Sequence, residues 1–156
     1  MRLLLQLSVV LCLSSALSYA CSCSPPITAG MASLNADVVF RGTIAALRDI
    51  KEVYPNGGAR YTRRIAVFRV RRVWKGRVGP IVEMIAPEEI MPCMASEPSY
   101  FKVGNDLLVY ANGSPKTSQY VMDSCSRTAM AQNAQEDIHD LGPGKEPRQV
   151  SKADSK

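Results

Sequence analysis

The sequence contains few of the side chains that support catalysis. Its 156 residues include a single histidine, His139, and a single tryptophan. One histidine is a poor basis for a histidine-based zinc site or for a cysteine–histidine nucleophile pair. We therefore expect His139 to be an ordinary surface residue of a non-catalytic protein.

Other catalytic signatures are also missing. The chain has no glycine-rich loop that could hold phosphate groups, and it has no Cys-x-x-Cys pair typical of structural zinc sites. Glu88 and Glu89 are adjacent carboxylates, but no aromatic sugar platform accompanies them, which disfavours a glycosidase. The sequence thus predicts neither an enzyme nor a bound cofactor.

The chain lacks a hydrophobic run long enough to span a membrane. The apolar segment 3–16 is shorter than the about 20 residues that a spanning helix needs. Arg2 precedes this segment, and Ser18-Tyr19-Ala20 follows it with the small residues that signal peptidase prefers. Residues 1–20 are therefore predicted to be a signal peptide of a secreted protein, extracellular or periplasmic.

Cleavage after Ala20 would leave four cysteines: Cys21, Cys23, Cys93 and Cys125. An even number of cysteines in an exported chain predicts two disulfides. A bond between Cys21 and Cys23 would close a strained loop. Two pairings remain open: Cys21–Cys93 with Cys23–Cys125, or the crossed arrangement.

Cleavage would also make Cys21 the first residue of the mature protein. Its α-amine and carbonyl would then lie on a residue that a disulfide can fix, and together they can chelate a metal. The α-amine has a pKa of about 7.7–8.0, so its deprotonation at neutral pH costs little. The alternative is a lipoprotein lipidated at Cys21, for which Ser18-Tyr19-Ala20 fits poorly.

The formal charge of +5 is unevenly distributed. The segment 60–77 contains eight basic residues and no acid: Arg60, Arg63, Arg64, Arg69, Arg71, Arg72, Lys75 and Arg77. It could be a strand whose solvent face is basic, or a face that binds sulfated glycans, anionic lipid or nucleic acid. Export disfavours nucleic acid, so a sulfated polyanion is the expected partner of such a face.

Five strand-like segments dominate the pattern of the remaining chain: 37–44, 61–74, 80–86, 106–111 and 119–124. Apolar residues alternate from Ala66 to Val70 and resume at Val73, which predicts a β-bulge near Arg71-Arg72. Turns are expected at 56–58 and at 112–115, the latter joining the last two strands as a hairpin.

A change to helical periodicity follows these strands. Apolar residues from Met130 to Leu141 predict an amphipathic helix, capped by Thr128 and ended by Gly142-Pro143-Gly144. Its acidic residues would lie late in the helix. The sequence predicts one mostly β domain over 21–142, a five-stranded Greek-key barrel of OB type with a C-terminal helix, and a disordered tail over 143–156.

Two motifs carry a resemblance to a known family. Cys21-Ser22-Cys23-Ser24-Pro25-Pro26, followed by the segment 34–41, resembles the start of a mature tissue inhibitor of metalloproteinases. The segment 101–110 and Ser124-Cys125-Ser126 are similar to the wider netrin-like module, and Val73-Trp74-Lys75-Gly76 resembles its compact bacterial members. The resemblance covers residues 21 to about 142.

The resemblance implies an OB-like barrel with the disulfides Cys21–Cys93 and Cys23–Cys125. It also implies that Cys21 binds the catalytic zinc of a target metalloproteinase, while Ser22 points toward the specificity pocket. Residues Pro92, Cys93 and Met94 would form the rest of the inserted ridge, together with Cys23. The implied protein is a secreted, monomeric inhibitor with no cofactor of its own.

This sequence also differs from the family pattern. Leu34 stands where one partner of a third cysteine pair would be, and the cysteine-rich second domain of the animal inhibitors is missing. The alternative function is a netrin-like binding module that inhibits no protease. It would bind a protein or a polyanion through the segment 60–77, with these side chains as candidates: Arg63, Arg64, Arg69, Arg71, Arg72 and Lys75.

Overall fold

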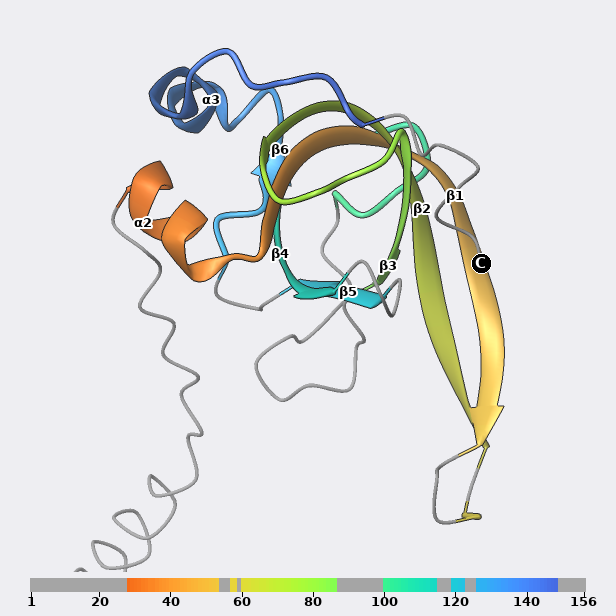
Figure 1. Ribbon diagram of the computed structural model, residues 1–156. Helices are drawn as coiled ribbons and strands as arrows, with labels where there is room; N and C mark the ends of the chain where they lie inside the picture. Colours follow the sequence, from red (N-terminus) through yellow and green to blue (C-terminus); the bar gives the residue numbers. More distant parts are fainter. Residues whose placement is uncertain are drawn as a thin grey trace, which may run out of the picture.

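The computed structural model describes residues 28–53, 57–58, 60–86, 100–114, 119–122 and 126–148. These residues form a mostly β structure with two short helices (Figure 1). The elements in chain order are α2 (Ala29–Asn35), β1 (Val38–Val53), β2 (Arg60–Lys75), β3 (Ile81–Ile85), β4 (Asp106–Ser114), β5 (Gln119–Met122), β6 (Ala129–Met130) and α3 (Gln135–Leu141).

Five strands are hydrogen bonded in a closed ring. Strand β1 pairs with β2, β2 with β3, β3 with β5, β5 with β4, and β4 pairs back to β1. Only the β3–β5 pair is parallel among these neighbours. The short β6 pairs with β4 beside the ring. The mostly β class and the five predicted strands are therefore confirmed, although three of them, β1, β2 and β4, are longer than predicted.

The inside of the ring is the main hydrophobic core. All three phenylalanines of the chain lie there, although aromatic residues are scarce overall. Phe68 makes edge-to-face contacts with Phe40 and Phe101, with ring centroids 5.5 and 6.0 Å apart. Such pairs stabilise by about 0.5–1.5 kcal/mol beyond the burial of their area. Alternation along β2 places Ala66, Phe68 and Val70 in this core, as period-two patterning requires.

The predicted bulge in β2 is confirmed. Arg72 pairs with Arg41 while Val70 pairs with Gly42, so Arg71 is the extra residue of β2. Trp74 is a second extra residue of β2, because Val73 pairs with Phe40 and Lys75 pairs with Val39. Each bulge increases the local twist of the strand. Two bulges near the end of β2 therefore help to curl it around the core.

The other ends of β1 and β2 leave the ring as a two-stranded arm, formed by residues 45–53 and 60–65 (Figure 1). Pairing continues to Val53 and Arg60 at its tip. Gly57, in the predicted turn, has a φ of 74°; Asn56 lies outside the described residues. The first strand was expected to end at residue 44, because the arm has no continuous apolar face that marks it as a strand.

A second, smaller core lies outside the ring, where the helices cover β1 and β4. Val39, Leu108 and Tyr110 point away from the first core and pack with Ala32 of α2 and Ala134 before α3. Helix α2 was not predicted. It buries only alanines, Ala29 and Ala32 within the helix and Ala36 after it, so no large apolar residue marks its inner face.

The C-terminal helix is shorter than predicted. It begins at Gln135, because Met130 pairs with Leu107 in β6 and the Ala131 N–H donates to the carbonyl oxygen of Asp106. The prediction that its acids lie late in the helix holds for Asp140 but is wrong for the other two. Glu136 and Asp137 are in the first turn, where the helix dipole favours negative charge. Thr128 is buried and does not cap this helix.

The segment after α3 is also ordered, so the prediction of a disordered tail is wrong for residues 143–148. We call residues 142–148 the strap. Trp74 Nε1 donates to the Gly142 carbonyl oxygen at 2.8 Å. Lys145 exchanges two backbone hydrogen bonds with Val73, and the Arg148 N–H donates to the Val78 carbonyl oxygen. Residues 149–156 lie outside the described residues.

The hairpin predicted between the last two strands is confirmed by the antiparallel pairing of β4 with β5. The turn predicted at residues 112–115 is wrong for residues 112–114, which continue β4, and Pro115 lies outside the described residues. The Gly113 N–H donates to Asp37 Oδ2 at 2.9 Å, and Asn112 Oδ1 accepts from the Asp37 N–H at 3.2 Å. Asp37, which is far away in sequence, thus helps to keep the Asn112-Gly113 segment extended.

Candidate functional site

The residues expected to contact a protease lie outside the described residues. They are Cys21, Ser22, Cys23, Pro92, Cys93 and Met94, and the same holds for Cys125. Both predicted disulfides, Cys21–Cys93 and Cys23–Cys125, and the pairing between them therefore stay predictions. What the structure does place are the described residues that follow the N-terminal segment and those that precede the other two cysteine-bearing segments.

These flanking residues lie on neighbouring strands. The N-terminal segment enters through α2 and β1, whose first residue, Val38, pairs with Ala111 of β4. Ala111 also pairs with Met122, the last residue of β5, after which the chain continues to Cys125. Val121 of β5 pairs in parallel with Ile85, the last residue of β3, after which the chain continues to Cys93. Three cysteine-bearing segments thus join the ring at one edge.

The helix that connects the N-terminal segment to this edge is held at both ends. At its start, Thr28 Oγ1 accepts from the Met31 N–H at 3.2 Å. At its end, the ammonium group of Lys75 donates to the carbonyl oxygens of Ser33 and Leu34 at 2.7 and 3.1 Å. A cation at this end complements the helix dipole. The chain that leads to Cys21 therefore starts from a fixed support.

The outer face of α2 is apolar and exposed. Met31 is 48 % exposed and Leu34 is 80 % exposed. A side chain as exposed as that of Leu34 contributes little to the packing of the core.

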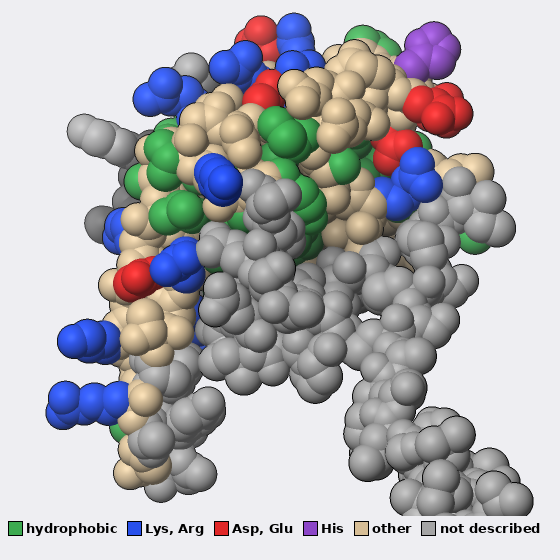
Figure 2. Space-filling model, turned by 180° about the vertical axis from the view of Figure 1, so that it is seen from behind, with side chains coloured by type: hydrophobic (Ala, Val, Ile, Leu, Met, Phe, Trp, Pro, Cys, Tyr) green, Lys and Arg blue, Asp and Glu red, His purple; other side chains and the backbone are tan. Residues whose placement is uncertain are grey.

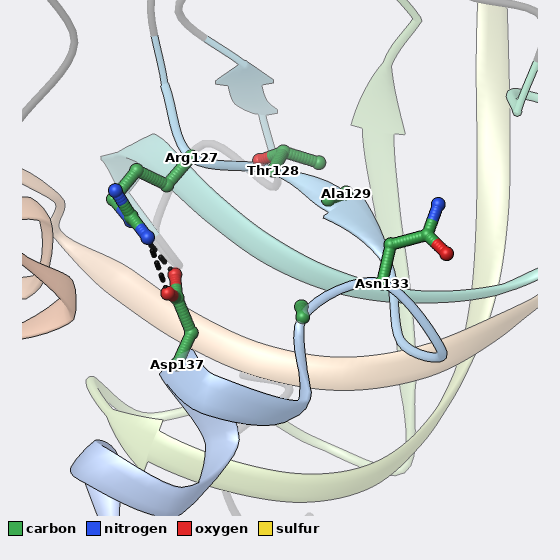
Figure 3. Close-up of a pocket in the computed structure, with 6 residues that line it drawn as sticks. Arg127, Thr128, Ala129, Asn133 and Asp137 are labelled. Carbon is green, nitrogen blue, oxygen red and sulfur yellow. Dashed lines mark hydrogen bonds and ion pairs between the residues drawn. The ribbon is translucent and has the colours of Figure 1, made fainter.

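A buried ion-pair network fastens α3 to β4 (Figure 3). Asp137 is 5 % exposed, and it accepts hydrogen bonds from the Arg127 guanidinium and, at 3.0 Å, from the Tyr110 hydroxyl. The hydrogen bonds from Arg127 hold the pKa of Asp137 below its ordinary value. Burial, reinforced by the negative charge of Asp137, raises the pKa of Tyr110.

This network holds elements of the fold together. Arg127, Thr128 and Asp137 line a depression of about 280 Å³ together with Ala129, Asn133 and Ala134 (Figure 3). Among the described residues of this lining, the charged groups of Arg127 and Asp137 neutralise each other, and no nucleophile faces a free base. The sequence signal that could have found it is weak, because Asp137 was expected on a polar face of the helix.

The basic stretch 60–77 is divided by the structure. In the arm, Arg63 lies 3.0 Å from Glu52, and Arg64 lies 2.9 Å from Asp49. In the ring, Arg69, Arg71 and Arg72 are exposed, and none has an ion pair with another described residue. Lys75, which was also a polyanion candidate, is directed at the end of α2. The candidates therefore do not form one surface.

Figure 2 shows the same division. Lys and Arg side chains lie along the projecting arm and again at the top of the ring.

His139 lies in the last turn of α3 and is exposed, as expected for a surface histidine. Within the described ranges, no three histidine, cysteine or acidic side chains are grouped as metal ligands would be. The described helices are too short to cross a bilayer.

Neither the models of known protein families nor the curated protein sequences contain a match to this chain. The functional argument therefore rests on the residues and on the fold.

Proposed function

We propose that this protein is a secreted inhibitor of zinc metalloproteinases, and that it binds the catalytic zinc through the α-amine and carbonyl oxygen of Cys21. The observation that carries the proposal is the shared edge of the ring. The segments that contain Cys93 and Cys125 follow the neighbouring ends of β3 and β5, and the segment that contains Cys21 and Cys23 leads through α2 to the start of β1 at the same edge. Two disulfides between these segments would hold the N-terminus against the ring.

Rigid attachment is what such an inhibitor needs. A flexible N-terminus would lose conformational freedom when it bound, whereas a fixed one has little left to lose. The anchored α2 and Pro25-Pro26 restrict the chain on one side, and the disulfides Cys21–Cys93 and Cys23–Cys125 restrict it on the other. Under this proposal Ser22 enters the specificity pocket, and residues 92–94 complete the inserted ridge.

The strand arrangement supports an OB-type Greek-key barrel as the scaffold. β5 lies between β3 and β4, and β4 pairs back to β1, so two of the five pairings in the ring join strands that are not consecutive in the sequence. The ring is also staggered. A path along paired residues from Arg48 passes through Ile65, Ile85 and the end of β5, and it returns to β1 near Val38. Barrels require such a stagger to close.

The decisive experiment adds one alanine before Cys21 and measures inhibition of a zinc metalloproteinase that cleaves a peptide substrate. The addition converts the α-amine into an amide, which is a poor zinc ligand. We expect inhibition to weaken at least 100-fold while the unfolding midpoint stays unchanged. One alanine added after Lys156 is the matched control and should inhibit like the parent protein. Equal inhibition by both variants would contradict the proposal.

A second candidate function is binding of a polyanion without protease inhibition. The observation in its favour is the trio Arg69, Arg71 and Arg72, which are exposed and have no ion pair among the described residues. Binding of a heparin-like polymer should weaken as salt is added, because exposed charges are screened. Replacement of all three arginines by glutamine tests whether the trio is the site: a loss of binding would place the site at the trio, and unchanged binding would place it elsewhere on the molecule.

A further inference from the structure

The strap brings two more cations to the end of the basic stretch. Its docking on Val73 and Val78 forms a depression of about 500 Å³, within the range of ordinary ligand sites. Charged side chains from both segments line it: Lys75 and Arg77 after β2, and Lys145, Glu146 and Arg148 in the strap. The sequence stretch 60–77 alone did not indicate this combination.

Most cations of this depression form no ion pair with another described residue. Arg77, Lys145 and Arg148 are exposed, and none forms an ion pair with another described residue. Glu146 is the single acid among the described residues of the lining, and Lys75 is already directed at the carbonyl oxygens of α2. Three free cations against one acid give the depression a positive field. Guanidinium groups bind the oxygens of sulfate and phosphate with two parallel hydrogen bonds.

We propose that this depression binds a sulfated sugar unit of an acidic polysaccharide. The inference deepens the second candidate function and rests on it. It also changes the location, from the exposed face of β2 to the composite site made by β2 and the strap.

The lining favours a sugar over a lipid surface. Trp74 is a half-buried residue of this lining, and a sugar in the depression would lie beside it while the cations bind its sulfates. Attachment to a membrane usually combines cations with exposed apolar side chains. The large hydrophobic residues that are exposed in the described structure are Met31, Leu34, Val53, Ile81, Val103 and Val121, and none of them lines this depression.

The strap's contribution can be removed without disturbing its docking. Lys145 and Arg148 are held through backbone atoms, so their side chains are free to change. The pocket variant is Arg77→Gln with Lys145→Gln and Arg148→Gln. The matched control is Arg69→Gln with Arg71→Gln and Arg72→Gln, which removes the same charge from the exposed face of β2.

Trp74 supplies a signal that is specific to this site, because it is the single tryptophan of the chain. The experiment titrates the full secreted protein with a heparin-derived oligosaccharide at low salt and records both the bound fraction and Trp74 fluorescence. We expect saturable binding with a change in fluorescence. The pocket variant should bind at least tenfold more weakly and lose the fluorescence change, whereas the control variant should stay within about threefold of the parent.

The outcomes separate this inference from the function on which it rests. If the control variant loses binding and the pocket variant does not, the polyanion function stands and the composite site is wrong. If the parent protein does not bind at low salt, both are wrong. The unsulfated oligosaccharide should not bind. Phosphatidylserine vesicles that bind as well as the sulfated sugar would overturn the assignment to a polysaccharide.

Discussion

The two halves of the β1–β2 ladder show how differently one pair of strands can be stabilised. In the ring, Ile44 of β1 pairs with Phe68 of β2, and both side chains are fully buried in the core. In the arm, the same strands stay paired, but cross-strand ion pairs such as Arg63–Glu52 lie on partly exposed side chains. Hydrogen bonding continues along both halves, so burial and not pairing distinguishes them. Stability should therefore be concentrated in the ring.

The largest effect is expected from Phe68→Ala in the ring. The substitution removes both edge-to-face contacts and leaves a cavity between Phe40 and Phe101. Losses for such substitutions are about 3–5 kcal/mol. Urea denaturation should show this decrease in the free energy of unfolding. A loss below about 1 kcal/mol would mean that the ring collapses around the gap and that its core is not tightly packed.

A smaller effect is expected where α3 is fastened to the ring. Asp137→Asn weakens a buried pair with Arg127, whose side chain is 29 % exposed, so we expect about 2–3 kcal/mol, below the range for fully buried pairs. Tyr110→Phe, which removes only the hydroxyl, should cost about 0.5–1.5 kcal/mol. Urea denaturation at pH 7 compares the two, and a greater loss for Tyr110→Phe would contradict the assigned roles.

The same pair predicts a pH dependence. The pKa of Asp137 is lowered in the folded state, so its contribution is fully present above the unfolded value of about 3.9 and is lost as pH falls through the folded value. The difference in unfolding free energy between the parent and Asp137→Asn should therefore shrink between pH 7 and pH 3. A constant difference would show that the charge of Asp137 is not what stabilises α3.

Gly42→Ala tests how closely the two strands approach at the bulge. An added Cβ would lie 2.9 Å from the Arg69 carbonyl oxygen and 3.3 Å from Val70 Cα, and both are backbone atoms that cannot turn aside. We expect a loss of about 1–3 kcal/mol in thermal or urea unfolding. Ala46→Gly, farther along β1 in the arm, is the comparison variant and should cost less. The reverse order would show that the bulge region yields more easily than the arm.

The smallest effect is expected in the arm. Arg63→Gln removes an ion pair with Glu52 on partly exposed side chains, and such pairs contribute about 0–1 kcal/mol. The unfolding free energy should change by less than 1 kcal/mol, and added salt should reduce even that difference. A loss comparable to that of Phe68→Ala would contradict the assignment of stability to the ring.

The sequence could predict the parts of the fold that carry a local pattern. Alternating apolar residues identify the inner face of β2, and their interrupted rhythm locates the bulge at Arg71. The sequence pattern did not predict helix α2, because the buried face of this helix consists of alanines. Met130 has helical spacing from Ala134, yet pairing with Leu107 places it in β6, because tertiary contacts outweigh local periodicity.

The candidate sites also divide into what the sequence pattern predicts and what only the tertiary structure adds. The chemistry of Cys21 comes from the sequence pattern and stays a prediction, while the structure adds the shared edge where the cysteine-bearing segments join. The composite depression could not be predicted, because Arg77 and Arg148 are far apart in sequence and meet only through the docking of the strap. Charge clustering in sequence pointed instead to Arg63 and Arg64, which the arm neutralises.

Selective acetylation of the α-amine most directly tests whether Cys21 binds the zinc of a target protease. Near neutral pH this amine, with a pKa of about 7.7–8.0, reacts before lysines, whose pKa is about 10.4. Mass spectrometry would confirm one acetyl group on Cys21, and inhibition of a zinc metalloproteinase would be measured before and after. We predict strong inhibition before acetylation and at least a 100-fold loss after it. Unchanged inhibition by the acetylated protein would contradict the proposed mechanism.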